Sequence, residues 1–324
     1  MKISREQETN EFPIPTTHTS CTDTGVSLQY WGGGIAMKSS QNRAKTVYSE
    51  SLRPLKGFFG RVRLTRDGVI ETFQNRETAD GLMIDHQELV RLQDRDISTE
   101  NIPGIHPDRP LVATSTVPDD YLHGLTLHDE LESVIEVGPH WYCPFDVPTY
   151  KDEDMDPKQR QKNLSNYIHG VRRAATILSK SQCMTKVLPL LKGVYPDELQ
   201  RCYEMIEPIA NGFVGVYVGQ FFGPTVGNRI TECRAWLRTI DAVCNPTGIV
   251  LIGLSSPQYL SGLPASVVGA AGRSQWLQAT NYLSLPQDES QQQLRLLCGD
   301  IHKALETGYN QLSLRQFTNG TIHG

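Results

Sequence analysis

Short apolar segments alternate with longer amphipathic stretches in the second half of the chain. The apolar segments have the length of strands, and the stretches between them are long enough for helices, so the pattern predicts a parallel sheet of buried strands. The apolar segments are residues 141–148, 186–193, 212–220 and 248–255.

The first half of the chain continues this alternation. Residues 81–85 predict a strand that ends at Asp85, and residues 87–93 predict the helix that follows it. A further strand is expected at 109–116 and an amphipathic helix at 127–137. The remaining helices are expected at 163–178, from Pro196 onward, at 229–243 and at 287–314.

The number of alternating units and the length of 324 residues predict an α/β fold, a (β/α)8 TIM-like barrel. Such a barrel takes about 250 residues, which leaves room for an N-terminal extension and C-terminal helices. Residues 1–24 are polar and without periodicity, and we expect a disordered tail there. Residues 25–324 are expected to form a single barrel domain.

The fold class predicts where a functional site lies. In parallel α/β folds the chemistry collects at the C-terminal ends of the strands. The residues that fall at these ends, and that we expect to line a ligand site, are Asp146, Lys192, Gly193, Gly219, Gln220 and Gly253.

The composition narrows the class of protein. With 38% apolar and 21% charged residues, and no run near the roughly 18 apolar residues that span a membrane, it is typical of a soluble globular protein. The first ten residues show no signal peptide, so the expected location is the cytoplasm. A net charge of −5 excludes a global basic field. The basic stretch 38–66 is either a solvated surface or a phosphate-contacting patch.

Seven cysteines are scattered along the chain, without a pair spaced by two residues. This spacing argues against a disulfide framework and against a cysteine zinc site. We therefore expect reduced, mostly buried thiols, and neither a metal nor another cofactor is indicated.

Cys143-Pro-Phe-Asp146-Val-Pro-Thr-Tyr150 resembles the strand-end motif of the tRNA-guanine transglycosylase superfamily, in which a Phe-Asp pair opens the base pocket. Later segments resemble family segments in the same order, namely residues 171–174, 190–199, 216–221 and 251–260. In the way it departs from the family pattern, the chain resembles the DNA-acting branch of the superfamily, the 7-deazaguanine transglycosylases. The resemblance implies a barrel that exchanges a guanine-type base in DNA or RNA, with DNA favoured over tRNA as the substrate.

The resemblance also implies roles for single residues. Asp146 would accept hydrogen bonds from N1 and the amino group of guanine or 7-deazaguanine, because a carboxylate has two acceptor oxygens for these two donors. Asp85, with Asp119 and Asp120 as competitors, would be the nucleophile of a covalent sugar intermediate. In the segment where the family carries its nucleophile, Arg273 would bind phosphate and Trp276 would stack on a base. His86, next to Asp85, is a candidate acid or base.

Two departures from the family pattern leave three functions open. Residues 269–276 contain no acid, and Cys298 is the only cysteine after Cys244. The chain is then a transglycosylase, or a non-catalytic nucleic-acid-binding member that assists a partner, or an unrelated barrel enzyme for a phosphorylated metabolite held by Lys192 and a glycine-bearing loop. No membrane partner is expected, and a homodimer or a partner protein is left open.

Overall fold

A computed structural model describes residues 55–319, except residues 107, 118–120, 122–123, 150–154 and 224–226. Side chains are described up to residue 307. These residues belong to one compact unit, Tyr48–Gly324. The predicted tail, the domain boundary at residue 25, and the candidates Asp119 and Asp120 lie outside the described residues.

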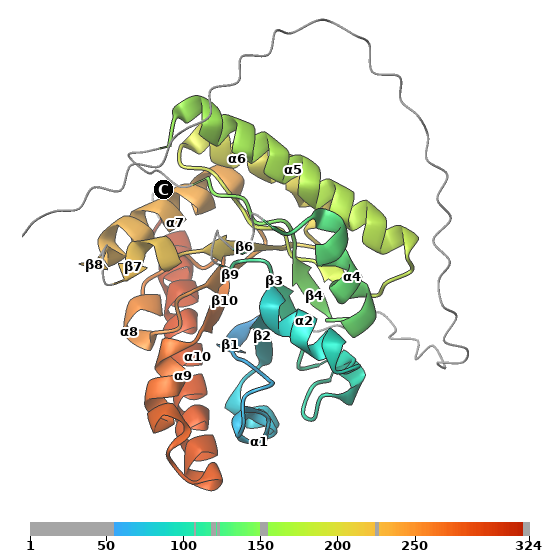
Figure 1. Ribbon diagram of the computed structural model, residues 1–324. Coiled ribbons are helices and arrows are strands. Elements are labelled where there is room, and N and C mark those ends of the chain that lie inside the picture. The colour runs from blue at the N-terminus through green and yellow to red at the C-terminus, as the bar shows by residue number, and fades with distance from the viewer. Residues whose placement is uncertain are drawn as a thin grey trace, which may run out of the picture. The chain divides into compact units, whose positions relative to one another are not determined.

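Eight parallel strands form the central sheet, which curls into a barrel (Figure 1). Its order is β5-β4-β3-β2-β1-β10-β9-β6. The parallel bridge between Leu190 and Gly215 joins the chain after β5 to β6 and closes the circle. This confirms the predicted (β/α)8 barrel. The strands are β1 (Gly57–Arg61), β2 (Gly81–Asp85), β3 (Leu111–Thr114), β4 (Trp141–Cys143), β5 (Lys186–Val187), β6 (Phe213–Tyr217), β9 (Gly248–Ile252) and β10 (Val267–Gly272).

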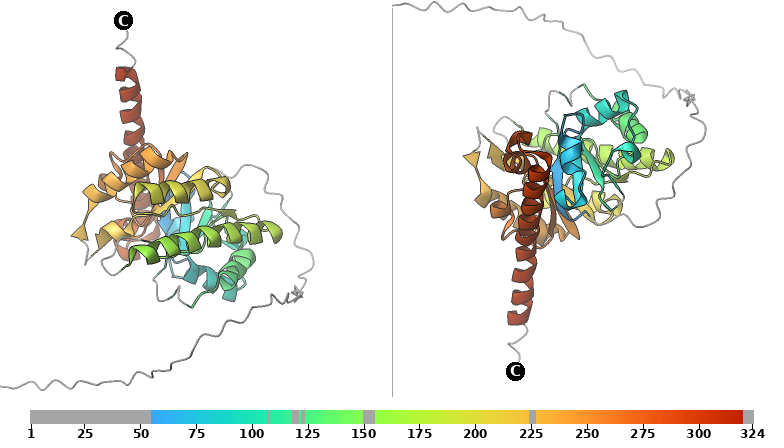
Figure 2. Two further views of the ribbon diagram at one scale, coloured as in Figure 1. Left: turned by 90° about the horizontal axis from the view of Figure 1, so that it is seen from above. Right: turned by 90° about the horizontal axis from the view of Figure 1, so that it is seen from below.

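Helices surround the barrel and connect its strands (Figures 1 and 2). Helices α5 and α6 lie side by side on one flank, and α10 packs against β1 and β10 on another. The helices are α1 (Val69–Phe73), α2 (His86–Asp94), α4 (Leu127–Val137), α5 (Pro157–Lys180), α6 (Pro196–Ile206), α7 (Ile230–Cys244), α8 (Pro257–Leu260), α9 (Ser274–Ala279) and α10 (Gln287–Asn319). A small antiparallel pair, β7 (Phe222–Gly223) and β8 (Gly227–Asn228), lies between β6 and α7 in the chain.

The predicted strands at 141–148 and 186–193 were too long, since β4 ends at Cys143 and β5 at Val187. Pro144 and Pro189 have no N–H group to donate to a neighbouring strand, which explains the early ends. Strands β1 and β10 were not predicted. Both contain glycine, and β10 reads VVGAAG, so they lack the run of β-branched residues that marks most strands.

Glycines in the strands make room for large side chains inside the barrel. A Cβ at Gly215 would lie 2.9 Å from Leu190 Cδ2, 3.4 Å from Ile252 Cδ1 and 3.8 Å from Cys143 Sγ. Gly215 therefore faces the interior, and Tyr217, two residues further along β6, faces the same side nearer the C-terminal end of the strand.

No helix in the described part of the chain has both the length and the apolar character to cross a bilayer. The described cysteines are free thiols, and all but the half-buried Cys183 are buried, in agreement with the prediction of reduced and mostly buried thiols.

Candidate functional site

Asp146 and Lys192, both predicted to line a site, meet at the C-terminal end of the barrel. Lys192 Nζ lies 2.5 Å from Asp146 Oδ1 and donates to Val147 O at 2.8 Å. The ammonium also lies over the Tyr167 ring, 5.2 Å from its centroid. The side chains of Lys192 and Asp146 are only 12% and 16% exposed, so the loops after β4 and β5 hold an ion pair in a fixed place.

The backbone of the β4 loop places Asp146. Phe145 has a φ of +56°, in the left-handed region, which is costly for a bulky residue and persists only where its surroundings enforce it. Its N–H donates to Glu130 Oε1 at 2.7 Å, and the next N–H, of Asp146, donates to Ser115 Oγ at 2.9 Å. The Phe145 ring packs against α5 at Gly170, where a Cβ would lie 2.1 Å from the ring.

Glu130, which anchors this loop, was missed by the sequence analysis. It is buried on α4, and burial raises the pKa of its carboxyl to about 7 even though Tyr142 Oη and the Phe145 N–H both donate to it. A sequence signal existed. Glu130 lies on the same side of the helix as Val134 and Val137, so an acid occupies the apolar stripe.

Asp85 is the last residue of β2 and caps helix α2. Its Oδ1 accepts a hydrogen bond from the Glu88 N–H at 2.9 Å, which is the usual role of aspartate at this position. The neighbouring His86 is buried, with Nδ1 3.0 Å from Tyr121 Oη and Nε2 3.0 Å from Ser133 Oγ of α4. Burial lowers the pKa of His86. These contacts give both residues structural roles between β2, α2 and α4.

Four arginines gather where β1 and β10 lie next to each other, and we call them the arginine cluster: Arg61, Arg63, Arg66 and Arg273. Arg61 ends β1 and Arg273 directly follows β10. The pKa of Arg273 is lowered, first by partial burial and then by the positive charges of Arg63, Arg66 and Arg61, while the Asp85 carboxylate opposes this shift. Within the described residues none of the four forms an ion pair with a carboxylate.

The arginine cluster contains the last three cations of the basic stretch predicted at 38–66. Arg61 is fixed by two contacts, because its Nη2 donates to Thr116 O at 2.6 Å and its carbonyl accepts from Trp276 Nε1 at 2.9 Å. Lys56, from the same stretch, precedes β1 and lies at the opposite end of the barrel. Residues 38–54 lie outside the described part.

Trp276 has a different place from the one predicted. It is 2% exposed and packs edge-to-face against Phe73, with ring centroids 5.2 Å apart. A ring so enclosed offers no face on which a base could stack, so its observed role is packing at the end of β1. At the C-terminal end of β6, the aromatic side chain of Tyr217 reaches solvent and is 40% exposed.

At the predicted glycines, Gly253 and Gly193, the backbone packs closely against neighbouring segments. Gly253 has a φ of +102°, and a Cβ there would lie 3.1 Å from Gly219 N, so the loops after β9 and β6 touch. Gly193 has a φ of +141°, and a Cβ there would lie 2.8 Å from Leu199 N, at the start of α6. Gln220 is half-buried in the short turn after Gly219.

The ion pair and the arginine cluster lie on opposite sides of one barrel end, because β4 and β5 are opposite β1 and β10 in the strand order. The thiol of Cys143 is influenced by charges from both the ion pair and the arginine cluster. Burial raises the pKa of its thiol to about 12, with Asp146 adding to the rise and Arg61 opposing it. Among the described side chains, the group that could hold a metal, Asp80, Cys298 and His302, lies elsewhere, at the N-terminal end of the barrel.

No family model matches the chain, and no curated protein matches it. Among solved structures, the tryptophan synthase alpha chain from Legionella pneumophila subsp. pneumophila aligns with a TM-score of 0.47 at 11% identity, covering 76% of this chain and 91% of that chain. The Amycolatopsis orientalis BexX/CysO complex gives 0.42 at 14% identity, covering 80% and 94%. A mutant tryptophan synthase alpha-subunit from Pyrococcus furiosus gives 0.43 at 11%, covering 76% and 99%. Likeness at this level concerns the fold alone.

Proposed function

We propose that the C-terminal end of the barrel binds a small phosphorylated molecule and that the chain is an enzyme acting on it. The arginine cluster is the observation that carries this proposal. Its like charges lie together, none of them forms an ion pair with a carboxylate among the described residues, and Asp85 opposes them only from beyond ion-pair distance. Guanidinium groups match phosphate oxygens with paired hydrogen bonds. In (β/α)8 barrels, phosphate sites are frequent at the loops after the seventh and eighth strands, and Arg273 follows the eighth.

The ion pair supplies the chemistry in this proposal. A ligand whose phosphate contacts the arginine cluster extends across the barrel end toward Asp146 and Lys192. The Asp146 carboxylate can accept a proton and the Lys192 ammonium can donate one, which are the two roles of general acid–base catalysis. The substrate class is therefore a phosphorylated metabolite that undergoes proton transfer away from its phosphate.

Base exchange in a nucleic acid is the second candidate. The arginine cluster suits backbone phosphates equally well, and the exposed ring of Tyr217 offers a surface on which a base could stack. Asp146 would bind the base edge through its second oxygen, since Oδ1 is engaged by Lys192. Asp85 would need to leave its capping position to serve as nucleophile.

Calorimetric titration with inorganic phosphate, pyrophosphate and a short DNA duplex tests the proposal. Arg273→Gln is expected to weaken pyrophosphate binding about tenfold or more, because a hydrogen bond to a charged group contributes about 1.5–3 kcal/mol. Arg95→Gln is the matched control, since Arg95 is an exposed arginine at the far end of α2. Equal affinities of both variants and the unaltered protein would refute the phosphate site. Tight, salt-sensitive binding of DNA alone would favour the second candidate.

A further inference from the structure

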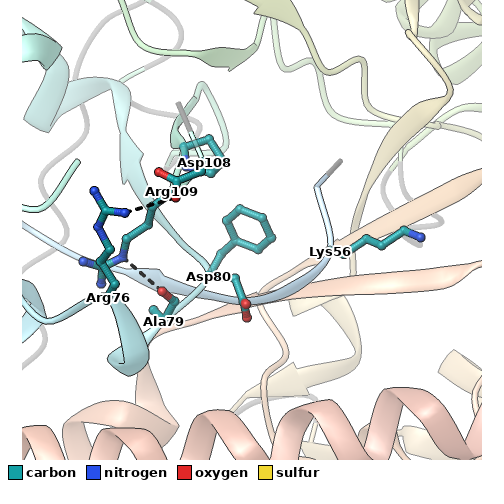
Figure 3. A pocket seen from close by; sticks show the side chains of 8 residues that line it. Lys56, Arg76, Ala79, Asp80, Asp108 and Arg109 are labelled. Carbon is teal, nitrogen blue, oxygen red and sulfur yellow. Dashed lines mark hydrogen bonds and ion pairs between the residues drawn. The ribbon is translucent and has the colours of Figure 1, made fainter. Parts of the chain in front are cut away.

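Three side chains of metal-binding type meet at the N-terminal end of the barrel. Asp80 directly precedes β2, and Cys298 and His302 lie one turn apart on α10. His302 Nε2 is 2.6 Å from Asp80 Oδ2, and Cys298 Sγ is 3.7 Å from Asp80 Oδ2 and 3.9 Å from His302 Nε2. Figure 3 shows the Asp80 carboxylate directed toward the helices of the C-terminal region, away from Arg109.

The separations match those around a tetrahedral metal ion. Zinc binds cysteine sulfur at about 2.3 Å and histidine nitrogen or carboxylate oxygen at about 2.0–2.2 Å, which places neighbouring ligand atoms roughly 3.2–3.8 Å apart. Both distances from the Cys298 sulfur are already near this range. Only the hydrogen-bonded contact between His302 and Asp80 has to open, by about 0.7 Å, to admit an ion.

The backbone around Asp80 is shaped to the cluster. The Phe58 N–H donates to Asp80 Oδ2 at 2.7 Å and so orients the carboxylate, as outer partners of metal ligands commonly do. Gly57 has a φ of +88°, and a Cβ there would lie 2.2 Å from Asp80 Oδ2 and 2.7 Å from His302 Nε2. Only glycine at this position leaves the three ligand atoms together.

Exposure is consistent with an ion that can enter and leave. Cys298 is buried, whereas the side chains of Asp80 and His302 are 34% and 43% exposed. Asp80 also lines a cavity of about 490 Å³ with Lys56, Arg76 and Arg109 (Figure 3). Because Asp80 and His302 are partly exposed, water can reach the cluster and complete the coordination.

We propose that Asp80, Cys298 and His302 bind a divalent metal ion of the zinc class, with water as the fourth ligand. The sulfur and imidazole ligands favour zinc over magnesium or calcium, which prefer oxygen-only sites. The ion would tie α10 to the start of β2. Asp80 lies 218 residues before Cys298 and 222 residues before His302 in the sequence. The Cys-x-x-x-His spacing on α10 was therefore the one local signal in the sequence for this site.

Cobalt(II) titration of the full-length protein under reducing conditions tests the site. Cobalt bound to a thiolate in a tetrahedral site gives a sulfur-to-cobalt charge-transfer band and intense visible d–d bands, and zinc added afterwards should abolish both. Cys298→Ser should remove the charge-transfer band. His302→Gln should weaken zinc binding by more than the about 10- to 100-fold that loss of an outer partner costs. Cys183→Ser and His128→Gln, which change a cysteine and a histidine outside the cluster, should leave the spectrum and affinity unchanged.

A folded protein that gives no charge-transfer band, or one that keeps the band in Cys298→Ser, would overturn the proposal. In that case the three side chains form only the hydrogen-bonded pair of Asp80 and His302 with Cys298 beside it. Because His302→Gln retains size and polarity, it keeps the test decisive if Cys298→Ser fails to fold. The arginine cluster lies at the other end of the barrel, so this outcome is independent of the phosphate proposal.

Discussion

At the scale of single residues, Glu130 and Phe145 explain how the candidate site is held. The carboxyl of Glu130 is buried below the β4 loop and receives the N–H of Phe145, whose left-handed backbone turns the chain toward Lys192. A buried carboxyl with a pKa of about 7 is unusual, and such groups are often found beside functional sites. We assign Glu130 a positioning role, because its contacts are with Tyr142 and the loop backbone.

Glu130→Gln should change the pH dependence of stability. The pKa is raised from 4.5 to about 7, so the folded state holds its proton more tightly than the unfolded state. As pH rises from 4.5 to 7, the free energy of unfolding should therefore fall by about 3 kcal/mol because of the titration of Glu130. Urea denaturation at several pH values should show this slope in the unaltered protein and a flatter curve in Glu130→Gln. The same slope in both proteins would contradict the assignment.

At the scale of elements, helix α5 shows how packing overrides local preference. Gly170 lies in the interior of a long helix, where alanine is favoured by about 1 kcal/mol. Its missing side chain forms the notch that receives the Phe145 ring. The glycine therefore serves the loop that carries Asp146 and not the helix itself.

Two Gly→Ala substitutions separate these effects. Gly170→Ala should destabilise the protein by about 1–2 kcal/mol, because overpacking costs about 1–3 kcal/mol and exceeds the gain in helix propensity. Gly299→Ala in α10 is the matched control, since a Cβ there meets nothing within 4 Å, and it should stabilise by up to about 1 kcal/mol. Chemical denaturation measures both, and stabilisation by Gly170→Ala would show that the Phe145 ring has room to move.

At the scale of the whole molecule, closure of the barrel joins distant parts of the chain. Strand β1 pairs with β10, about 200 residues later, and α10 packs along both. This closure places Arg61 beside Arg273 at one end and Asp80 beside Cys298 and His302 at the other. Both inferred sites therefore depend on the same long-range contact.

Docking of α10 should therefore contribute strongly to global stability. Ile301 belongs to α10 and is fully buried, and Ile301→Ala should lower the free energy of unfolding by about 2–5 kcal/mol. Leu296, on the same helix, is 58% exposed, and Leu296→Ala should change it by less than about 0.5 kcal/mol. Circular dichroism and intrinsic tryptophan fluorescence should report one common transition. Separate transitions would show that α10 is not part of the cooperative unit.

The sequence allowed some residues of the candidate site to be predicted and left others unrecognised. Asp146 and Lys192 could be found because each follows an apolar strand, and strand ends meet at one end of a parallel barrel. Tyr217 was overlooked because its exposure depends on neighbours from other elements. Glu130 was overlooked although its position in the apolar stripe of α4 was a local signal. Trp276 was expected to stack on a base beside Arg273, but its ring is buried and packs against Phe73.

The sequence by itself determined the class of fold and the places where strands end, because strand–helix alternation is a local property of the apolar pattern. It also placed the charged side chains of Asp146 and Arg273 near the ends of strands, where a ligand site is expected. Only the tertiary structure decided which charges became partners. The Asp146–Lys192 pair depends on the pairing of β4 with β5. The arginine cluster and the group of Asp80, Cys298 and His302 combine residues that only closure of the barrel brings together.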